Sequence, residues 1–294
     1  MAKINAVTLV FCLVLGVSGS FADRGMIPVN PNARIFEPIQ RAMIAWNGKE
    51  EILLLSTDVS ASESTIVLEV LPLPSEPKVK KGTLETFQKA VALINSKLQK
   101  SKTLSRGEAE AGIKAPGGEV TFHKKIGAHD ISVTHLLNAE SFVDWVRDYL
   151  KSLGIEKDVI SGEMKGLINE YIENDFVWFV FDVISLSEET VTNEPIQYHF
   201  GTERLFYPLR ITSTGEGDTS IELLILTPRL LRNFPGLPIT RVRLKHDPIT
   251  ITNNELKILN EDMYDLLGYL ERLKLRIWEI KGDLKSFNSD LIAY

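Results

Sequence analysis

The segment FVWFVFDVI, residues 176–184, is the most hydrophobic stretch after residue 22 and decides the predicted fold. It shows no alternation of apolar and polar residues, and it is rich in β-branched and aromatic side chains. Such a run is typical of a central strand that is covered on both faces. Asp182 is the only charged residue within it. We expect this carboxylate to meet a buried cation, because an isolated buried charge is prohibitively costly.

Strand and helix patterns surround this segment. Asn47-Gly48, between the apolar runs 41–46 and 51–59, predicts a β-hairpin. A second hairpin is expected between residues 205–212 and 220–226. Other strands are expected at 65–71, 120–126, 131–135, 241–244 and 249–251, and helices at 84–98, 139–153 and 158–173. Because strands are grouped early and late with helices between them, the sequence predicts an α+β domain over residues 23–252, with mixed, mainly antiparallel sheets and packed helices.

Residues 253–294 carry the most regular pattern, after a capping box that begins at Thr252 and ends at Glu255. Apolar residues then recur at spacings of three and four, which predicts a long amphipathic helix. The helix either docks on its own domain or mediates self-association, since the stripe spans more than four heptads. The stripe consists of Leu256, Leu259, Met263, Leu266, Leu270, Leu273, Ile277, Ile280 and Leu284.

Residues 1–22 have the pattern of a secretory signal peptide. Lys3 precedes an apolar stretch over 4–17, and Ser20-Phe21-Ala22 places small residues before a cut at Asp23. The stretch is shorter than the ~20 residues of a permanent transmembrane helix. An uncleaved anchor is the alternative interpretation. We therefore expect a secreted or extracytoplasmic protein with no membrane span after cleavage.

Composition restricts the function further. The 294 residues are 44% apolar and carry a net charge of −6, which excludes wholesale disorder and argues against nucleic acid as a partner. Cys12, the only cysteine, lies in the signal segment, so the mature chain has no thiol. Disulfides, zinc sites built on cysteine and cysteine nucleophiles are therefore excluded. We expect no cofactor and no metal.

No motif for a nucleophile elbow, a zinc protease or a phosphate-binding loop is present. His123, His129 and His135 are spaced six apart, too far along one strand to share a metal. Arg210 lies inside an apolar run, and our hypothesis is that it pairs with Asp182, or with another acid on an adjacent strand, as a structural ion pair. The alternative is that both charges lie in water at strand ends. The catalytic residues, if there are any, stay unknown. A hydrolase site near His129, Asp130 and Arg210 is the alternative to a non-enzymatic protein.

Several short motifs carry a family resemblance. They are Ile35-Phe36-Glu37-Pro38-Ile39-Gln40 before the hairpin, the Leu71–Val79 block, Lys125–Ile131, Trp145 and Tyr207–Ile211. In this order, over residues 34–230, the chain resembles domain-of-unknown-function family 2330, uncharacterised secreted prokaryotic proteins. The resemblance implies an extracytoplasmic location and no established activity or site residues. Some members carry cysteines near the mature N-terminus, and this chain has none there.

The sequence thus favours a non-enzymatic extracytoplasmic protein, which is a binding or cell-envelope interaction module. Its partners would be a second copy of the chain, through the C-terminal stripe, or another cell-envelope protein.

Overall fold

A computed structural model describes residues 24–30, 32–102, 124–156, 158–215, 217–231, 237 and 241–294. Residues 1–23, with the expected signal peptide, and His123 lie outside the described residues. Within this part of the chain the fold consists mainly of β-strands, sixteen of them in three sheets, with five α-helices. The expected α+β class is therefore wrong, because strands make up most of the regular structure.

The largest sheet has nine strands and is continuous from β13 to β5. Its order is β13 (Val242–Leu244), β15 (Leu273–Asp283), β12 (Asp218–Thr227), β2 (Ile35–Trp46), β3 (Glu50–Ala61), β10 (Ile196–Gly201) and β5 (Lys78–Lys81), with β14 (Ile249–Ile251) on β15 and β9 (Val191–Thr192) on β3. β2 and β12 run parallel, and the other pairs are antiparallel. The hairpin predicted at Asn47-Gly48 joins β2 to β3 and is confirmed.

The second sheet contains the segment that decided the prediction. Its order is β1 (Gly25–Pro28), β4 (Thr65–Leu73), β8 (Trp178–Leu186), β7 (His129–His135) and β6 (Lys124–Ile126), all antiparallel. β8 is its central strand, as predicted. Both of its faces are covered, because Val180 lies in the core between the sheets while Phe179 and Phe181 lie in the core on the opposite side.

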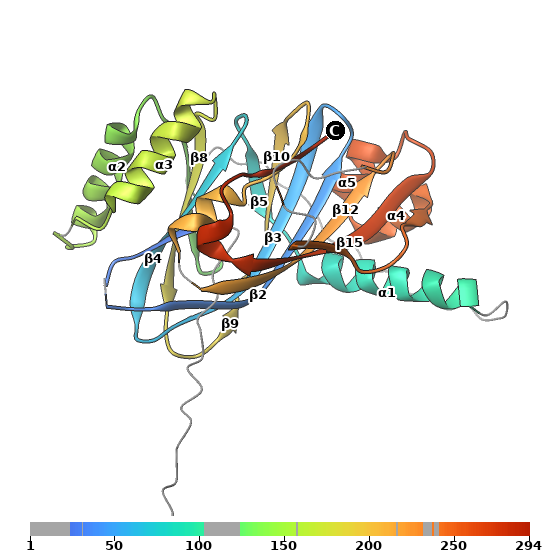
Figure 1. Ribbon diagram of the computed structural model, residues 1–294, viewed down its shortest axis with the longest axis horizontal. Coiled ribbons are helices and arrows are strands. Elements are labelled where there is room, and N and C mark those ends of the chain that lie inside the picture. The colour runs from blue at the N-terminus through green and yellow to red at the C-terminus, as the bar shows by residue number, and fades with distance from the viewer. Residues whose placement is uncertain are drawn as a thin grey trace, which may run out of the picture.

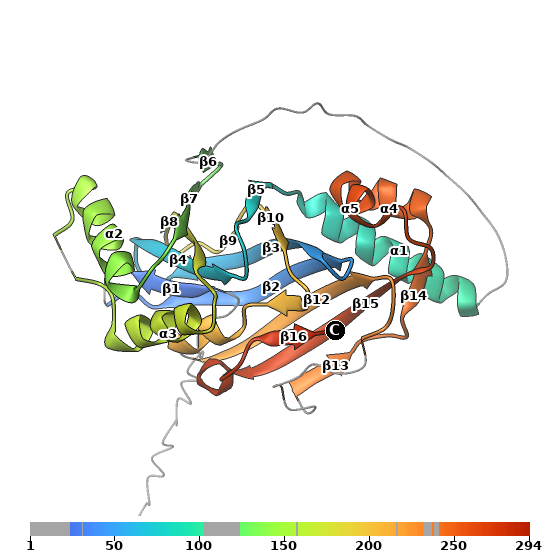
Figure 2. The same ribbon diagram turned by 90° about the horizontal axis from the view of Figure 1, so that it is seen from above.

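Figures 1 and 2 show the layers of the molecule. The two large sheets share one core, to which the two-stranded sheet of β11 (Leu205–Tyr207) and β16 (Leu291–Ala293) also contributes. Helices cover the outer faces. α2 (Ala139–Ser152) and α3 (Gly162–Glu173) pack on the five-stranded sheet. α1 (Leu84–Lys102), α4 (Asn253–Leu259) and α5 (Glu261–Leu267) pack on the nine-stranded sheet.

The long C-terminal helix does not exist. The capping box at Thr252 is present, but the helix that it starts, α4, ends at Leu259. Asn260 has extended backbone angles and caps α5 with its side chain. After α5, Arg272 adopts a left-handed conformation with φ 61°, and the chain continues as β15.

The stripe of apolar residues is therefore distributed over two helices, a strand and the short 3-10 helix η3 (Leu284–Ser286). Leu273 and Ile277 of β15 face the core under α4 and α5, whereas Ile280 and Leu284 lie in the core between the sheets. A strand with apolar residues on both faces produces spacings of three and four by coincidence. These residues pack within the cores of their own chain.

The second predicted hairpin is also absent. β11 ends at Tyr207, and residues 210–214 form the 3-10 helix η1. β11 pairs with β16 instead of β12, and β12 lies between β2 and β15. No helix in the described part of the chain has the length and apolarity needed to cross a membrane.

Candidate functional site

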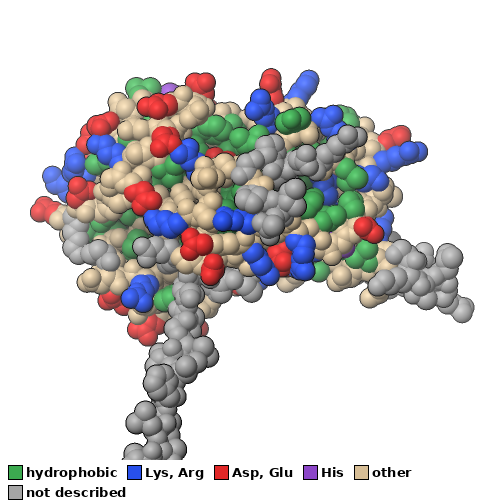
Figure 3. All heavy atoms as spheres, in the orientation of Figure 1, with side chains coloured by type: hydrophobic (Ala, Val, Ile, Leu, Met, Phe, Trp, Pro, Cys, Tyr) green, Lys and Arg blue, Asp and Glu red, His purple; other side chains and the backbone are tan. Residues whose placement is uncertain are grey.

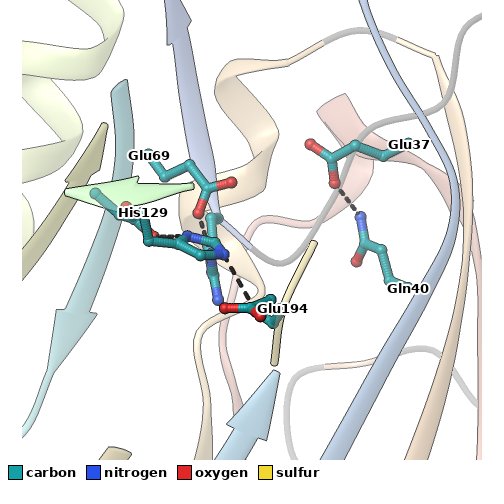
Figure 4. A network of polar contacts seen from close by, with 7 residues as sticks. Glu37, Gln40, Glu69, His129 and Glu194 are labelled. Carbon is teal, nitrogen blue, oxygen red and sulfur yellow. Dashed lines mark hydrogen bonds and ion pairs between the residues drawn. The ribbon is translucent and has the colours of Figure 1, made fainter. Parts of the chain in front are cut away.

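Four ionisable side chains meet on the inner face of the five-stranded sheet, and we call them the buried ion cluster: Arg24, Glu69, His129 and Asp182. Sheet register brings them together. Glu69 of β4 lies directly opposite Asp182 of β8, and Ile131 of β7 lies opposite Asp182 on the other side. His129 is two residues before Ile131 and so shares its face. Figure 4 shows Glu69 and His129 directed toward each other.

Each member of the buried ion cluster has an ionic partner. Arg24 Nη1 donates to Glu69 Oε2 and lies 3.8 Å from Asp182 Oδ2. His129 Nδ1 is 2.5 Å from Asp182 Oδ2, and His129 Nε2 donates to the carbonyl oxygen of Glu194 at 3.1 Å. Both ring nitrogens face acceptors, and this arrangement favours the doubly protonated imidazole. Two cations thus balance two carboxylates.

The surroundings of the cluster shift the pKa values of its members. Burial raises the pKa of Glu69, and the Arg24 guanidinium opposes this shift. Burial acts to lower the pKa of His129, but the hydrogen bond and charge of Asp182 outweigh it, so the pKa lies above its usual value. The folded environment therefore favours the ionised form of His129.

The cluster is sealed from solvent, since its side chains are at most 4% exposed. Ligand atoms of Glu69, His129 and Asp182 lie within 4.8 Å of one another, close enough to hold a metal ion. Arg24, however, already supplies positive charge at this position. A sealed imidazole with both nitrogens engaged has no access to a substrate, so the arrangement acts as a structural ion network between strands.

The residues that the sequence singled out are separated. Arg210 lies in η1 and forms its ion pair with Glu170 of α3, whereas Asp182 belongs to the buried ion cluster. Asp130 accepts a hydrogen bond from the hydroxyl of Tyr149 in α2, on the face of β7 opposite to His129. His129, Asp130 and Arg210 therefore share no site. The sequence analysis missed Glu69, although it interrupts an apolar strand in the same way as Asp182 does.

A separate cavity of about 470 Å³ opens where three chain segments meet, and we call it the C-terminal pocket. Its size is within the range of small-molecule sites, roughly 300–1,000 Å³. The lining residues are Glu170, Tyr171, Asn174, Phe176, Arg204, Arg210, Asn288, Ser289, Asp290, Ile292 and Tyr294. Apolar walls and convergent polar groups thus occur together, as in most ligand sites.

Asp290 is the polar centre of the C-terminal pocket. Its Oδ1 accepts the hydroxyl of Tyr171 at 2.9 Å and the backbone N–H of Arg210 at 2.8 Å. Burial raises the pKa of Asp290 to about 6, although these hydrogen bonds and the Arg210 charge oppose the shift. Burial, together with the Asp290 charge, raises the pKa of Tyr171 well above its usual value. Asp290 therefore changes its charge in a pH range in which ordinary aspartates are already ionised.

Two guanidinium groups line the C-terminal pocket and differ in their pairing. Arg210 is neutralised by Glu170. Arg204 is exposed, and its guanidinium makes no ion pair with any described residue. Arg204 is therefore the cation available to a ligand. Figure 3 shows acidic and basic side chains interspersed over the face that it draws. The binding of a charged ligand to this face therefore depends on individual residues and their ion pairs, and not on a large patch of one charge.

Comparison with known proteins gives a family but no activity. Residues 20–233 match the family described as "Uncharacterized protein conserved in bacteria (DUF2330)", which confirms the resemblance seen in the sequence. No curated protein matches the chain.

Two solved structures are similar over most of their length. Baculovirus P35 has a TM-score of 0.41 at 9% identity, covering 91% of this chain and 98% of that chain. A mutated baculovirus P35 after caspase cleavage has a TM-score of 0.38 at 11% identity, covering 87% and 98%. Similarity at this level supports no functional argument.

Proposed function

This chain belongs to the DUF2330 family of uncharacterised proteins conserved in bacteria, and we propose that it is a non-enzymatic extracytoplasmic binding protein whose ligand occupies the C-terminal pocket. The ligand is a small organic carboxylate with an apolar or aromatic body. The single observation that carries this proposal is the Arg204 guanidinium, which forms no ion pair with any described residue and lines a cavity of about 470 Å³.

The chemistry of the lining supports a carboxylate. A guanidinium presents a planar set of donors that matches two carboxylate oxygens. Phe176 and Ile292 provide apolar surface in the same cavity, and Tyr294 adds an exposed ring. Glu170 and Arg210 pair with each other, so Arg204 and Asp290 are the remaining charged side chains among the described lining residues.

The absence of a catalytic arrangement in the pocket supports binding rather than catalysis. Asp290 Oδ1 is engaged by Tyr171 and Arg210, and neither a serine–histidine pair nor a pair of free carboxylates lies among the described lining residues. His129 is not among the residues that line this cavity.

The extracytoplasmic location is supported by the sequence of residues 1–22. Arg24, two residues after the expected cut, belongs to the buried ion cluster, so a described residue next to the expected cut takes part in the fold. N-terminal sequencing of the exported chain tests this part. A first residue at Asp23 supports it, and full-length chain in the cell interior contradicts it.

A thermal-shift screen tests the binding proposal. Wild-type protein is heated with pairs of small carboxylates and their neutral amides, such as phenylacetate and phenylacetamide. We expect at least one carboxylate to raise the midpoint by several degrees while its amide does not, and we expect R204Q to lose the shift. Equal shifts in wild type and R204Q, or no shift across the screen, contradict the proposal.

A further inference from the structure

The strand β16 and the residues beside it form one side of the C-terminal pocket. Ile292 of β16 lies directly opposite Phe206 of β11. The backbone N–H of Phe206 donates to Glu51 Oε2 at 2.8 Å, so it points away from β16. Hydrogen-bonded and non-hydrogen-bonded pairs alternate along an antiparallel ladder, and the residues of a non-hydrogen-bonded pair direct their N–H and C=O groups away from each other. The N–H and the carbonyl of Ile292 therefore point away from β11.

This outer edge of β16 has no partner strand in the described part of the chain. β16 pairs with β11 alone, and neither backbone group of Ile292 has a hydrogen-bond partner among the described residues. Ile292 is half-buried and lines the C-terminal pocket. Asp290 and Tyr294, which are two residues away on either side, line the pocket as well. The open strand edge and the cavity are therefore adjacent.

A cation and an apolar wall lie at the same edge. One position beyond the paired residues, the register of β11 and β16 places Arg204 level with Tyr294. The ring of Phe176 lies 5.0 Å from the ring of Phe206, measured between centroids, and Phe176 lines the cavity together with Arg204. Arg204 forms no ion pair with any described residue, as shown above. A cation, an aromatic surface and an open strand edge thus meet in one cavity.

This combination has the chemistry that recognises the end of a peptide. A peptide main chain can extend a sheet at an open edge, and its terminal carboxylate can be bound by a cation beside that edge. A small carboxylate without amide groups would use only the guanidinium of Arg204. A peptide would also use the N–H and the carbonyl of Ile292.

We propose that the ligand of the C-terminal pocket is the free C-terminus of a peptide, which binds as a further strand on the outer edge of β16. Its carboxylate pairs with Arg204, and its apolar last side chain contacts Phe176. Its main chain accepts a hydrogen bond from the N–H of Ile292 and donates one to the carbonyl of Ile292. This inference rests on the proposed carboxylate-binding function and narrows the class of ligand.

Calorimetric titration with four probes tests the inference. The probes are phenylacetate, N-acetyl-alanyl-alanyl-phenylalanine, the C-terminal amide of that peptide, and the same peptide with a free carboxylate and N-methylated main-chain nitrogens. We expect the unmodified peptide to bind at least tenfold more tightly than phenylacetate. The amide loses the charge that pairs with Arg204, and the N-methylated peptide loses its main-chain donors. Each should therefore bind at least tenfold more weakly than the unmodified peptide.

Three variants locate the peptide on the protein. I292P removes the N–H that the peptide needs, and proline is tolerated where the N–H of an edge strand points away from its neighbour. I292P should lower the affinity for the peptide at least fivefold more than the affinity for phenylacetate. R204Q should lose at least tenfold with both ligands. R147Q, an exposed control outside the pocket, should bind both within threefold of the wild type.

The outcomes separate this inference from the proposed function. If phenylacetate binds and R204Q loses it, while N-methylation leaves the affinity for the peptide unchanged, strand pairing is overturned and the carboxylate site stands. This comparison uses wild-type protein, so it decides the question even if I292P does not fold. If neither phenylacetate nor the peptide binds, or R204Q binds both as the wild type does, the inference and the proposed function both fail.

Discussion

Glu69 and Asp182 lie directly opposite each other on the adjacent strands β4 and β8, and both carboxylates are buried. Like charges in this position repel each other and destabilise a sheet unless cations are close. Arg24, which directly precedes the edge strand β1, and His129 from β7 supply those cations from the two sides. The pair therefore joins four strands of the sheet through one charge network.

Replacing Arg24 by methionine should lower the free energy of unfolding by about 3–5 kcal/mol at pH 7. The loss arises because two buried carboxylates would keep only one cation. Urea denaturation measures it. R147M is the control, since Arg147 and Asp144 form a largely exposed pair and should contribute at most ~1 kcal/mol. Equal losses in R24M and R147M would show that the network is not structural.

The charge of His129 should make stability depend on pH. Its pKa is raised in the folded state, so its contribution is complete below about pH 6.5 and is lost as pH rises through the folded value. The free energy of unfolding should therefore fall with rising pH in this window, and H129Q should remove that part of the slope. H135Q, at the exposed end of the same strand, is the control. A slope that persists in H129Q would refute the assignment.

Deleting residues 253–294 should abolish folding. β15 lies inside the nine-stranded sheet, between β12 and the short strands β13 and β14, and its removal would expose apolar faces in two cores. Circular dichroism and proteolysis of the truncated chain measure the result. A soluble, cooperatively folded remainder would show that residues 253–294 are not needed for the fold of the rest of the chain.

Asp290 should destabilise the folded protein as it ionises. Its folded pKa is about 6, above the ordinary value of about 3.9, so the contribution of Asp290 to stability is greatest below pH 4 and falls until pH passes 6. A shift of two units corresponds to about 3 kcal/mol at most. Urea titrations from pH 4 to 7 should show this loss in the wild type and not in D290N. The exposed Asp144, as D144N, should leave the slope unchanged.

Local signals predicted the parts of the fold that depend on neighbouring residues. Asn47-Gly48 produced its hairpin, and the uninterrupted run at 176–184 became a central strand because both of its faces are covered. The C-terminal prediction failed for a related reason. β15 also has apolar residues on both faces, and together these residues gave the spacing of a helical stripe. In the structure the helix ends at Asn260, and after α5 the left-handed Arg272 leads into β15.

The candidate sites depend on pairing between segments that are far apart in the sequence, so most of their residues could not be predicted from local sequence patterns. A charge inside an apolar strand indicated Asp182, and the same signal applies to Glu69 in TIVLEVLPL. Nothing local connects Arg24 with these strands. The C-terminal pocket unites three segments, 170–176, 204–210 and 288–294, which only the β11–β16 pairing and the position of α3 bring together.

The proposed function depends most directly on whether Arg204 and Asp290 set the charge of the ligand site. The deciding measurement is calorimetric titration of the carboxylate found in the screen into wild type, R204Q and D290N at pH 5.5 and 7.5. Protonation of Asp290 removes a negative charge from the pocket, so the wild type should bind more tightly at pH 5.5.

R204Q should lose at least tenfold in affinity at both pH values, and D290N should bind with little dependence on pH. R147Q, far from the lining residues in sequence and exposed, should match the wild type. Affinity that is equal in wild type and R204Q, and that does not change with pH, would contradict a carboxylate-binding C-terminal pocket.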